Sequence, residues 1–241
     1  MRLLDFTFEQ PTANLALDEV LLDRVASGHA PPTLRFWESA TPFVVIGSGQ
    51  RCRDVVHVFN CLRDGVPVLR RCSAGGAVLQ GPGCLNFALA LRYSEYPEAA
   101  DLHGSYAYIM GRVAEALNTL GIDAQRAGIS DLEIESRKVS GNAQRRKSTA
   151  CLHHGTLLHA VDIEAMARYL AEPADRPDYR GTRSHAEFVG ALPARAAQLR
   201  AAVAGRFAPQ ETAEAPLPAE IEAAHCLARE KYLRDAWTYR R

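Results

Sequence analysis

A glycine-rich loop between short apolar runs places the tightest constraint on how this chain folds. Residues 73–83 have the sequence SAGGAVLQGPG. Short β-rich or alternating apolar runs lie on both sides of it, at residues 33–37, 43–47, 66–70 and 84–91. The runs around the glycine loop are hairpin-like in their spacing, with no crossover helix of the kind that parallel pairs need. The pattern therefore favours an α+β sheet with helices packed on one side.

Helical spacing of apolar residues predicts helices in much of the remaining chain. The expected helices cover residues 14–25, 106–120, 163–171, 192–207 and 218–232. Further β-rich runs lie at residues 129–134, 137–140 and 151–161. Strands and helices are interspersed without a regular βαβ alternation, which supports the α+β class.

Length and charge exclude several classes of function. The chain has 241 residues, and its 28 Lys and Arg balance its 28 Asp and Glu. A chain of this length buries a full core, whereas a dedicated nucleic-acid binder would carry net positive charge. No apolar run approaches the roughly 18 residues of a membrane helix, and early acidic residues are unlike a signal peptide. We expect a cytoplasmic protein whose partners are neither nucleic acid nor membrane.

Six scattered cysteines without a CxxC pair indicate reduced thiols. Cys151 differs from the rest because His153, His154 and the cations at 145–147 lie close in sequence. Nearby positive charge lowers a thiol pKa, so Cys151 is a candidate nucleophile. The alternative is a small buried hydrophobe. His153 and His154 point to opposite faces of a strand, and we expect no metal site.

Arg70 and Arg71 directly precede the glycine loop. Guanidinium groups match phosphate or carboxylate oxygens, and glycine lets backbone N–H groups approach a ligand closely. Neither a P-loop nor a GxGxxG motif is present. The loop is therefore either an anion-binding turn or a plain hairpin with two solvated arginines.

Lys138 lies within a short β-run that continues into Ser140, Gly141 and Asn142. On a regular strand, Lys138 and Ser140 share one face and Val139 takes the other. If Val139 packs inward, Lys138 faces solvent. If the face of Lys138 lines a cleft, the strand holds a positive charge suited to a developing oxyanion or phosphate.

Taken in order, these strings resemble the catalytic domain of the lipoate–protein ligase, octanoyltransferase and biotin ligase superfamily. The matching strings are NLALD at 14–18, GSGQ at 47–50, RRCSAGG at 70–76, LNF at 85–87, RKVSGNAQ at 137–144 and HGTLL at 154–158. The resemblance implies a mixed, largely antiparallel β-sheet flanked by helices. It implies a catalytic acyl-binding domain at residues 1–207, with a C-terminal linker and helix at 208–241 packed on the same domain.

The resemblance also implies the residues of the site. Lys138 would be the catalytic lysine. The substrate-binding residues would be Arg70, Arg71, Ser73, Gly75, Gly76, Ala77, Asn86, Ser140, Gly141, Asn142, His154 and Gly155.

The implied reaction attaches a lipoyl or octanoyl group to a lysine of a lipoyl carrier protein, either a lipoyl domain or a glycine-cleavage H-type protein. In the ligase route, ATP with Mg activates free lipoate or octanoate as an acyl-adenylate. In the alternative transferase route, Cys151 takes octanoyl from an acyl carrier protein as a thioester. Ala74 and Gln80 depart from the family pattern, which leaves room for a non-catalytic acyl- or carrier-binding module.

Overall fold

Two β-sheets form the frame of the computed structural model, which describes residues 1–173 and 176–240. The larger sheet has the strand order β1-β2-β6-β10-β9-β8-β7, and the smaller has the order β4-β3-β5. The strands of the larger sheet are β1 (Arg2–Asp5), β2 (Thr33–Trp37), β6 (Cys84–Arg92), β7 (Gln125–Ala127), β8 (Asp131–Ile134), β9 (Arg137–Arg146) and β10 (Ala150–Leu158). Those of the smaller sheet are β3 (Phe43–Ile46), β4 (Val68–Arg70) and β5 (Val78–Gln80).

Antiparallel pairing dominates both sheets. Among the named strands of the described chain, only β1 with β2 and β3 with β4 run parallel. The predicted α+β class with a mixed, largely antiparallel sheet is therefore confirmed.

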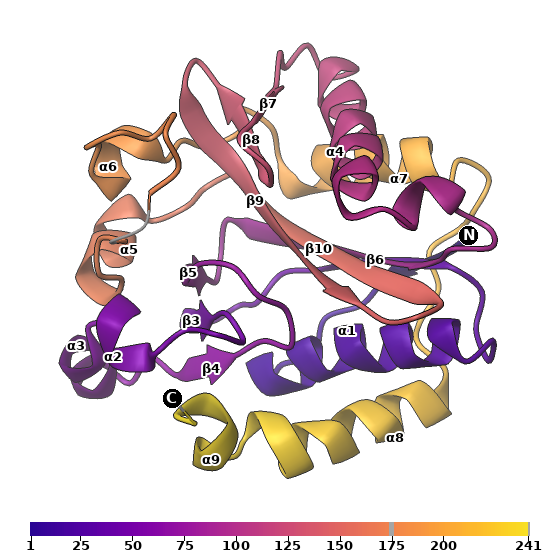
Figure 1. Cartoon of the computed structure of the whole chain (residues 1–241), viewed down its shortest axis with the longest axis horizontal. Helices are drawn as coiled ribbons and strands as arrows, with labels where there is room; N and C mark the ends of the chain where they lie inside the picture. Colours follow the sequence, from indigo (N-terminus) through magenta and orange to yellow (C-terminus); the bar gives the residue numbers. More distant parts are fainter. Residues whose placement is uncertain (174–175, 241) are drawn as a thin grey trace.

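Helices cover both faces of the larger sheet (Figure 1). On one face lie α4 (Leu102–Asn118) and α7 (Ala196–Phe207), and on the other lie α1 (Pro11–Ala26) and α8 (Pro218–Leu227). The expectation of helices on one side only was wrong.

The inner strand β6 explains this arrangement, because both of its faces are apolar. Phe87, Leu89 and Leu91 enter the core under α4. Ala88 and Ala90, which point the other way, enter the core under α1. Two apolar faces each require a covering layer.

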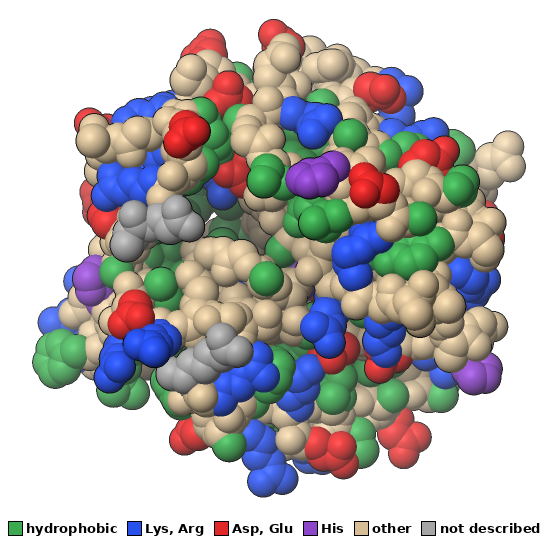
Figure 2. Space-filling view, viewed as in Figure 1, with side chains coloured by type: hydrophobic (Ala, Val, Ile, Leu, Met, Phe, Trp, Pro, Cys, Tyr) green, Lys and Arg blue, Asp and Glu red, His purple; other side chains and the backbone are tan. Residues whose placement is uncertain are grey.

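The remaining elements complete the periphery. They are α2 (Cys52–Val55), α3 (Val58–Asp64), the 3₁₀ turn η1 (Pro97–Ala99), α5 (Ile163–Tyr169), α6 (His185–Phe188), the π-helical turn η2 (Ala228–Tyr232) and α9 (Asp235–Thr238). None of the described helices is long and apolar enough to cross a membrane. On the face in Figure 2, basic and acidic side chains are intermixed.

The C-terminal segment packs against α1 and the smaller sheet. Ala224 of α8 and Tyr232 of η2 join the core formed by α1. The Lys231 ammonium and the Tyr232 hydroxyl both donate to the Glu19 carboxylate of α1. The helix expected over 218–232 is α-helical only to Leu227 and ends in the π-helical turn. Within this turn, two successive side chains reach one carboxylate. Arg241, the last residue of the predicted C-terminal segment, lies outside the described residues.

Candidate active site

One row of facing residues crosses five strands and forms the wall of a pocket. Strand register aligns Trp37 of β2, Asn86 of β6, Thr156 of β10, Gly141 of β9 and Asp131 of β8. All five residues line the same pocket. The sheet therefore brings together residues up to 119 positions apart, Trp37 and Thr156, without any loop between them.

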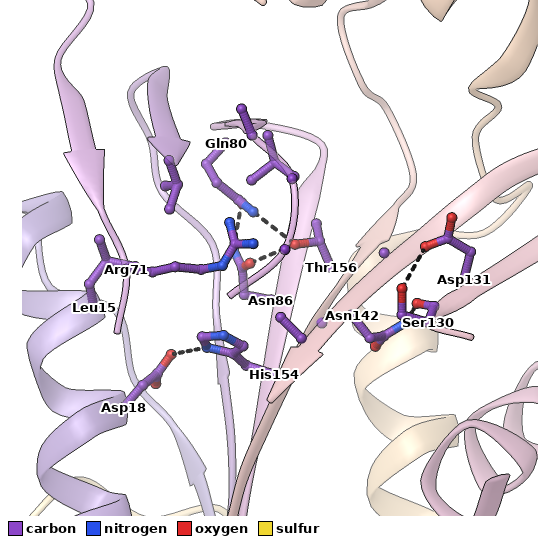
Figure 3. Close-up of a pocket in the computed structure, with 18 of the residues that line it drawn as sticks. Leu15, Asp18, Arg71, Gln80, Asn86, Ser130, Asp131, Asn142, His154 and Thr156 are labelled. Carbon is purple, nitrogen blue, oxygen red and sulfur yellow. Dashed lines mark hydrogen bonds and ion pairs between the residues drawn. The ribbon is translucent and has the colours of Figure 1, made fainter. Parts of the chain in front are cut away.

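The next row along the strands deepens this wall. His154 of β10 faces Ala88 on β6 and Ala143 on β9. The small Gly141 and Ala143 leave room in front of Thr156 and His154. Leu15 and Asp18 of α1, together with Gly75, Gly76, Ala77 and Val78, enclose the other sides (Figure 3). The cavity of about 150 Å³ suits a slender chain rather than a drug-sized ligand, which needs about 300–1,000 Å³.

A β-bulge turns Lys138 into this pocket. Leu132 pairs with Ser140, but the next residue, Glu133, pairs with Lys138, so β9 carries Val139 as an extra residue. Val139 is consequently buried in the core under α4, as Ser140 is buried beside it. The expectation that Lys138 and Ser140 share a face was wrong, because a bulge breaks the alternation and re-aims the next side chain.

Asp131 holds the Lys138 ammonium in place. Lys138 Nζ lies 2.9 Å from Asp131 Oδ1, and the Tyr179 hydroxyl donates to Asp131 Oδ2. The side chain of Lys138 lies across Gly141, whose ideal Cβ would stand 2.9 Å from Lys138 Cε. Burial and the Asp131 charge raise the pKa of Tyr179, so its hydroxyl remains a donor at neutral pH.

Arg71 brings a second cation to the pocket. Its Nε donates to Ser73 Oγ, and its Nη2 donates to the carbonyl of Ala74. Its Nη1 has no hydrogen-bond partner among the described residues. Burial lowers the pKa of Arg71 to about 10, which leaves the guanidinium charged at neutral pH.

Gly47 and Gly75 approach their neighbours too closely for a larger residue at either position. An ideal Cβ on Gly47 would lie 2.0 Å from the carbonyl oxygen of Gly75. Gly75 itself has a φ of 98°, in the left-handed region, and packs on the Arg71 guanidinium. Ser48 N donates to Ser73 O and ties the two turns together.

His154 connects the loop to helix α1. Its Nε2 lies 2.6 Å from Ser73 Oγ, and its Nδ1 lies 4.0 Å from Asp18 Oδ2. Figure 3 shows the imidazole and the Asp18 carboxylate facing each other at the base of the pocket. Asp18 is also paired with the buried Arg35 at 2.6 Å and accepts from Trp37 Nε1.

Three amide and hydroxyl side chains form a closed ring on the pocket wall. Gln80 Nε2 donates to Thr156 Oγ1, which donates to Asn86 Oδ1, and Asn86 Nδ2 donates to Gln80 Oε1. The three groups satisfy one another, so the wall carries dipoles of fixed direction without charge.

Asn142 lines the pocket, and its side chain bonds groups that lie behind the pocket wall. Its Nδ2 donates to the carbonyl of Ser130 and, at 3.2 Å, to Ser140 Oγ. Its Oδ1 accepts from His153 Nε2, while Gln144 donates to His153 Nδ1. Burial lowers the pKa of His153 to about 3, so this imidazole is neutral and serves only as a connector.

Three of the residues selected from the sequence lie outside the pocket. Arg70 donates to the backbone carbonyls of Gly47, Gln50 and Thr238, among others, and so ties α9 to the turn beside the glycine loop. Ser140 faces the core under α4. Arg70 and Arg71 point to different surroundings because consecutive residues of an extended chain alternate.

Cys151 also lies outside the pocket. Strand alternation puts Cys151 on the face of β10 opposite to His154, fully buried in the core under α4. Burial raises the pKa of its thiol to about 11, although Arg146 acts in the opposite direction. The thiol is therefore protonated and shielded from the pocket.

The other selected residues lie in the pocket or touch it. Ser73 contacts the pocket through His154. The residues that line the pocket itself are Lys138, Arg71, Gly75, Gly76, Ala77, Asn86, Gly141, Asn142, His154 and Gly155. Sequence reasoning did not select Asp18, Trp37, Thr156 or Tyr179. Asp18 and Thr156 fall within strings that carried the resemblance.

Comparison with known proteins agrees with this geometry. The sequence profile of the lipoyl protein ligase A/B catalytic domain matches residues 10–211. The lipoate-protein ligase A of Blochmanniella floridana is 32% identical over 188 residues, which are 76% of this chain and 52% of that protein. The chain spans about half the length of the curated relatives it matches.

Two solved structures share the fold. A bi-partite lipoate protein ligase from Thermoplasma acidophilum, studied with its E2 lipoyl domain, superposes with a TM-score of 0.86 at 24% identity, covering 99% of this chain and 95% of that one. A lipoate-protein ligase A bound with ATP superposes with a TM-score of 0.83 at 22% identity, covering 99% and 98%. Because the profile match spans most of the chain, the protein belongs to the lipoyl protein ligase A/B catalytic-domain family.

Proposed function

We propose that this protein is an ATP-dependent lipoate–protein ligase. It would activate lipoate or octanoate as an acyl-adenylate and pass the acyl group to a lysine of a lipoyl carrier protein. The observation that carries the proposal is the pair of fixed cations, Arg71 and Lys138, in one slender pocket. The names of the relatives, and the ATP bound by one structural neighbour, support the same reading.

The first step would form the acyl-adenylate. A carboxylate oxygen of the acid attacks the α-phosphorus of ATP, and the bond from that phosphorus to the pyrophosphate oxygen breaks. Negative charge moves over the phosphate and carboxylate oxygens during this exchange. Lys138, held by Asp131, and Arg71, with its Nη1 available, supply positive charge that needs no reorganisation.

The second step would transfer the acyl group. The ε-amine of the carrier lysine attacks the acyl carbon, and AMP leaves. ATP would enter as its magnesium complex, because Mg²⁺ is commonly bound through substrate phosphates and waters with few protein ligands. Among the described residues no group of three His, Cys, Asp or Glu side chains is arranged to hold a metal ion.

The position of Cys151 favours the ligase route over the thioester route. A thiolate nucleophile must reach the acyl carbon, and Cys151 is buried on the far face of β10 with its pKa raised to about 11. The acceptor would be a lipoyl domain or a glycine-cleavage H-type protein. An acyl carrier protein would be the donor only in the thioester route.

Intact mass spectrometry of the carrier tests the proposal. Incubation with Mg·ATP, lipoate and a lipoyl domain should add one lipoyl group to the domain, and octanoate should add one octanoyl group. Lys138→Ala should abolish the mass gain while retaining the melting temperature. Lys147→Ala is the matched control, because Lys147 pairs with Asp23 outside the pocket. Tight acid binding without any mass gain would indicate a non-catalytic binding module instead.

A further inference from the structure

Acyl transfer to a lysine releases two protons, and the second leaves the nitrogen inside the pocket. The acceptor is an ammonium in water, with a pKa near 10.4, and only its neutral amine attacks. As the N–C bond forms and the bond from carbon to the AMP oxygen breaks, a second proton leaves the nitrogen. A base in the pocket would therefore accelerate this step. The inference of such a base rests on the function proposed above.

Most ionisable groups of the pocket are already committed. Asp18 is paired with Arg35, and Asp131 is paired with Lys138. A carboxylate in an ion pair is a weaker proton acceptor, because protonation discards the pairing. Arg71 is a cation without a lone pair to offer.

His154 is the remaining base among the described residues that line the pocket. Its side chain is 14% exposed, whereas the neighbouring His153 is fully buried, with both ring nitrogens bonded to amides. Burial lowers the pKa of His153 to about 3. Of the two adjacent imidazoles, only His154 is placed to meet a substrate.

The contacts of His154 orient its ring for proton acceptance. Arg71 Nε donates to Ser73 Oγ, so we assign the hydroxyl hydrogen of Ser73 to His154 Nε2, 2.6 Å away. The Asp18 carboxylate faces Nδ1 at 4.0 Å and favours a proton there. Nε2 is then the nitrogen with the lone pair. Asp18 would stabilise the imidazolium formed, as an acidic residue does beside a catalytic histidine.

We propose that His154 is the general base of acyl transfer to the carrier lysine. The carrier lysine gives its ammonium proton to water and enters as the neutral amine. One of its N–H groups takes the place of the Ser73 O–H at Nε2, and the nitrogen attacks the acyl carbon while this second proton moves to Nε2. AMP leaves with the electron pair of the broken C–O bond. The imidazolium releases its proton to water when the products leave.

Hydroxylamine separates this role from a structural one. It is neutral near pH 7 and captures an activated acyl group without a base. The test compares His154→Gln with the wild type in two reactions, acylation of the lipoyl domain and formation of the acyl hydroxamate from acid, Mg·ATP and hydroxylamine. Glutamine can accept from Ser73 and donate toward Asp18, but it is not basic.

We expect His154→Gln to lose about 100-fold more in acylation of the lipoyl domain than in formation of the hydroxamate, because only the first reaction needs the base. His159→Gln is the control, because His159 bonds Glu38 outside the pocket, and both of its rates should match the wild type. Unchanged lysine acylation in His154→Gln, or an equal loss of both reactions, would overturn the assignment. A wild type that forms neither product would instead refute the proposed function, and this assignment with it.

Discussion

Replacing Gly141 with alanine should lower activity while leaving the protein as stable as before. The new Cβ would stand 2.9 Å from Lys138 Cε and 3.0 Å from Lys138 Nζ. Because non-bonded carbons prefer about 3.5–4.0 Å, the ammonium must retreat by about 0.5–1 Å. A displacement of about 1 Å in a reacting group can cost about 100-fold in rate.

Stability should respond differently from activity. The end of Lys138 is flexible, and Gly141 does not have a positive φ. A Gly→Ala change at a compatible position stabilises by about 0.4–1 kcal/mol, which offsets the displaced lysine. The free energy of unfolding should therefore change by less than about 1 kcal/mol.

Pyrophosphate release and carrier mass measure the activity of Gly141→Ala, and urea unfolding measures its stability. Gly205→Ala is the matched control, because Gly205 lies exposed on α7 with open space around it. That variant should keep full activity. Wild-type activity in Gly141→Ala would show that the position of the Lys138 ammonium does not limit the reaction, and the reasoning above would fail.

Three further predictions concern strand β10, which pairs with β9. Gly155→Ala should destabilise by about 1–3 kcal/mol, because the new Cβ would lie 1.9 Å from Asn142 Oδ1; an unchanged urea midpoint would contradict this close approach. Cys151→Ser should retain carrier acylation within twofold, and native Cys151 should resist iodoacetamide at pH 8 because burial raises its pKa to about 11; loss of activity would reinstate the thioester route. The pKa of His153 is lowered to about 3 in the fold and is near 6.5 when unfolded, so the unfolded chain binds more protons between these values. Stability should be full above pH 6.5 and fall by up to about 1.4 kcal/mol per unit of pH below it, and His153→Gln should flatten this slope; parallel slopes would refute the assignment.

Local patterns were sufficient for the fold class and most of the pocket. The two arginines and the glycine loop form one continuous string, and Lys138 lies in a second one. The chemistry of each string was therefore visible before their arrangement in space. The helix boundaries predicted from the sequence were less accurate. The helix expected at 106–120 begins at Leu102, because Asp101 accepts from Gly104 N and caps a first turn that apolar spacing does not reveal.

The face on which each side chain lies required the paired strands. Alternation alone placed Lys138 with Ser140, and one extra residue in β9 reversed that placement. Likewise, adjacent arginines look equivalent in sequence, yet Arg70 braces the backbone while Arg71 enters the pocket. Such outcomes depend on register, which is set by residues far along the chain.

The order of short strings along the chain identified the family, because those strings hold most of the residues that line the pocket. The residues that hold these groups in place come from distant parts of the chain. Tyr179 reaches Asp131 from 48 positions away, and His154 acquires its surroundings from α1 and the glycine loop. Long-range contacts of this kind arise when burial brings distant elements together, so no local pattern of residues encodes them.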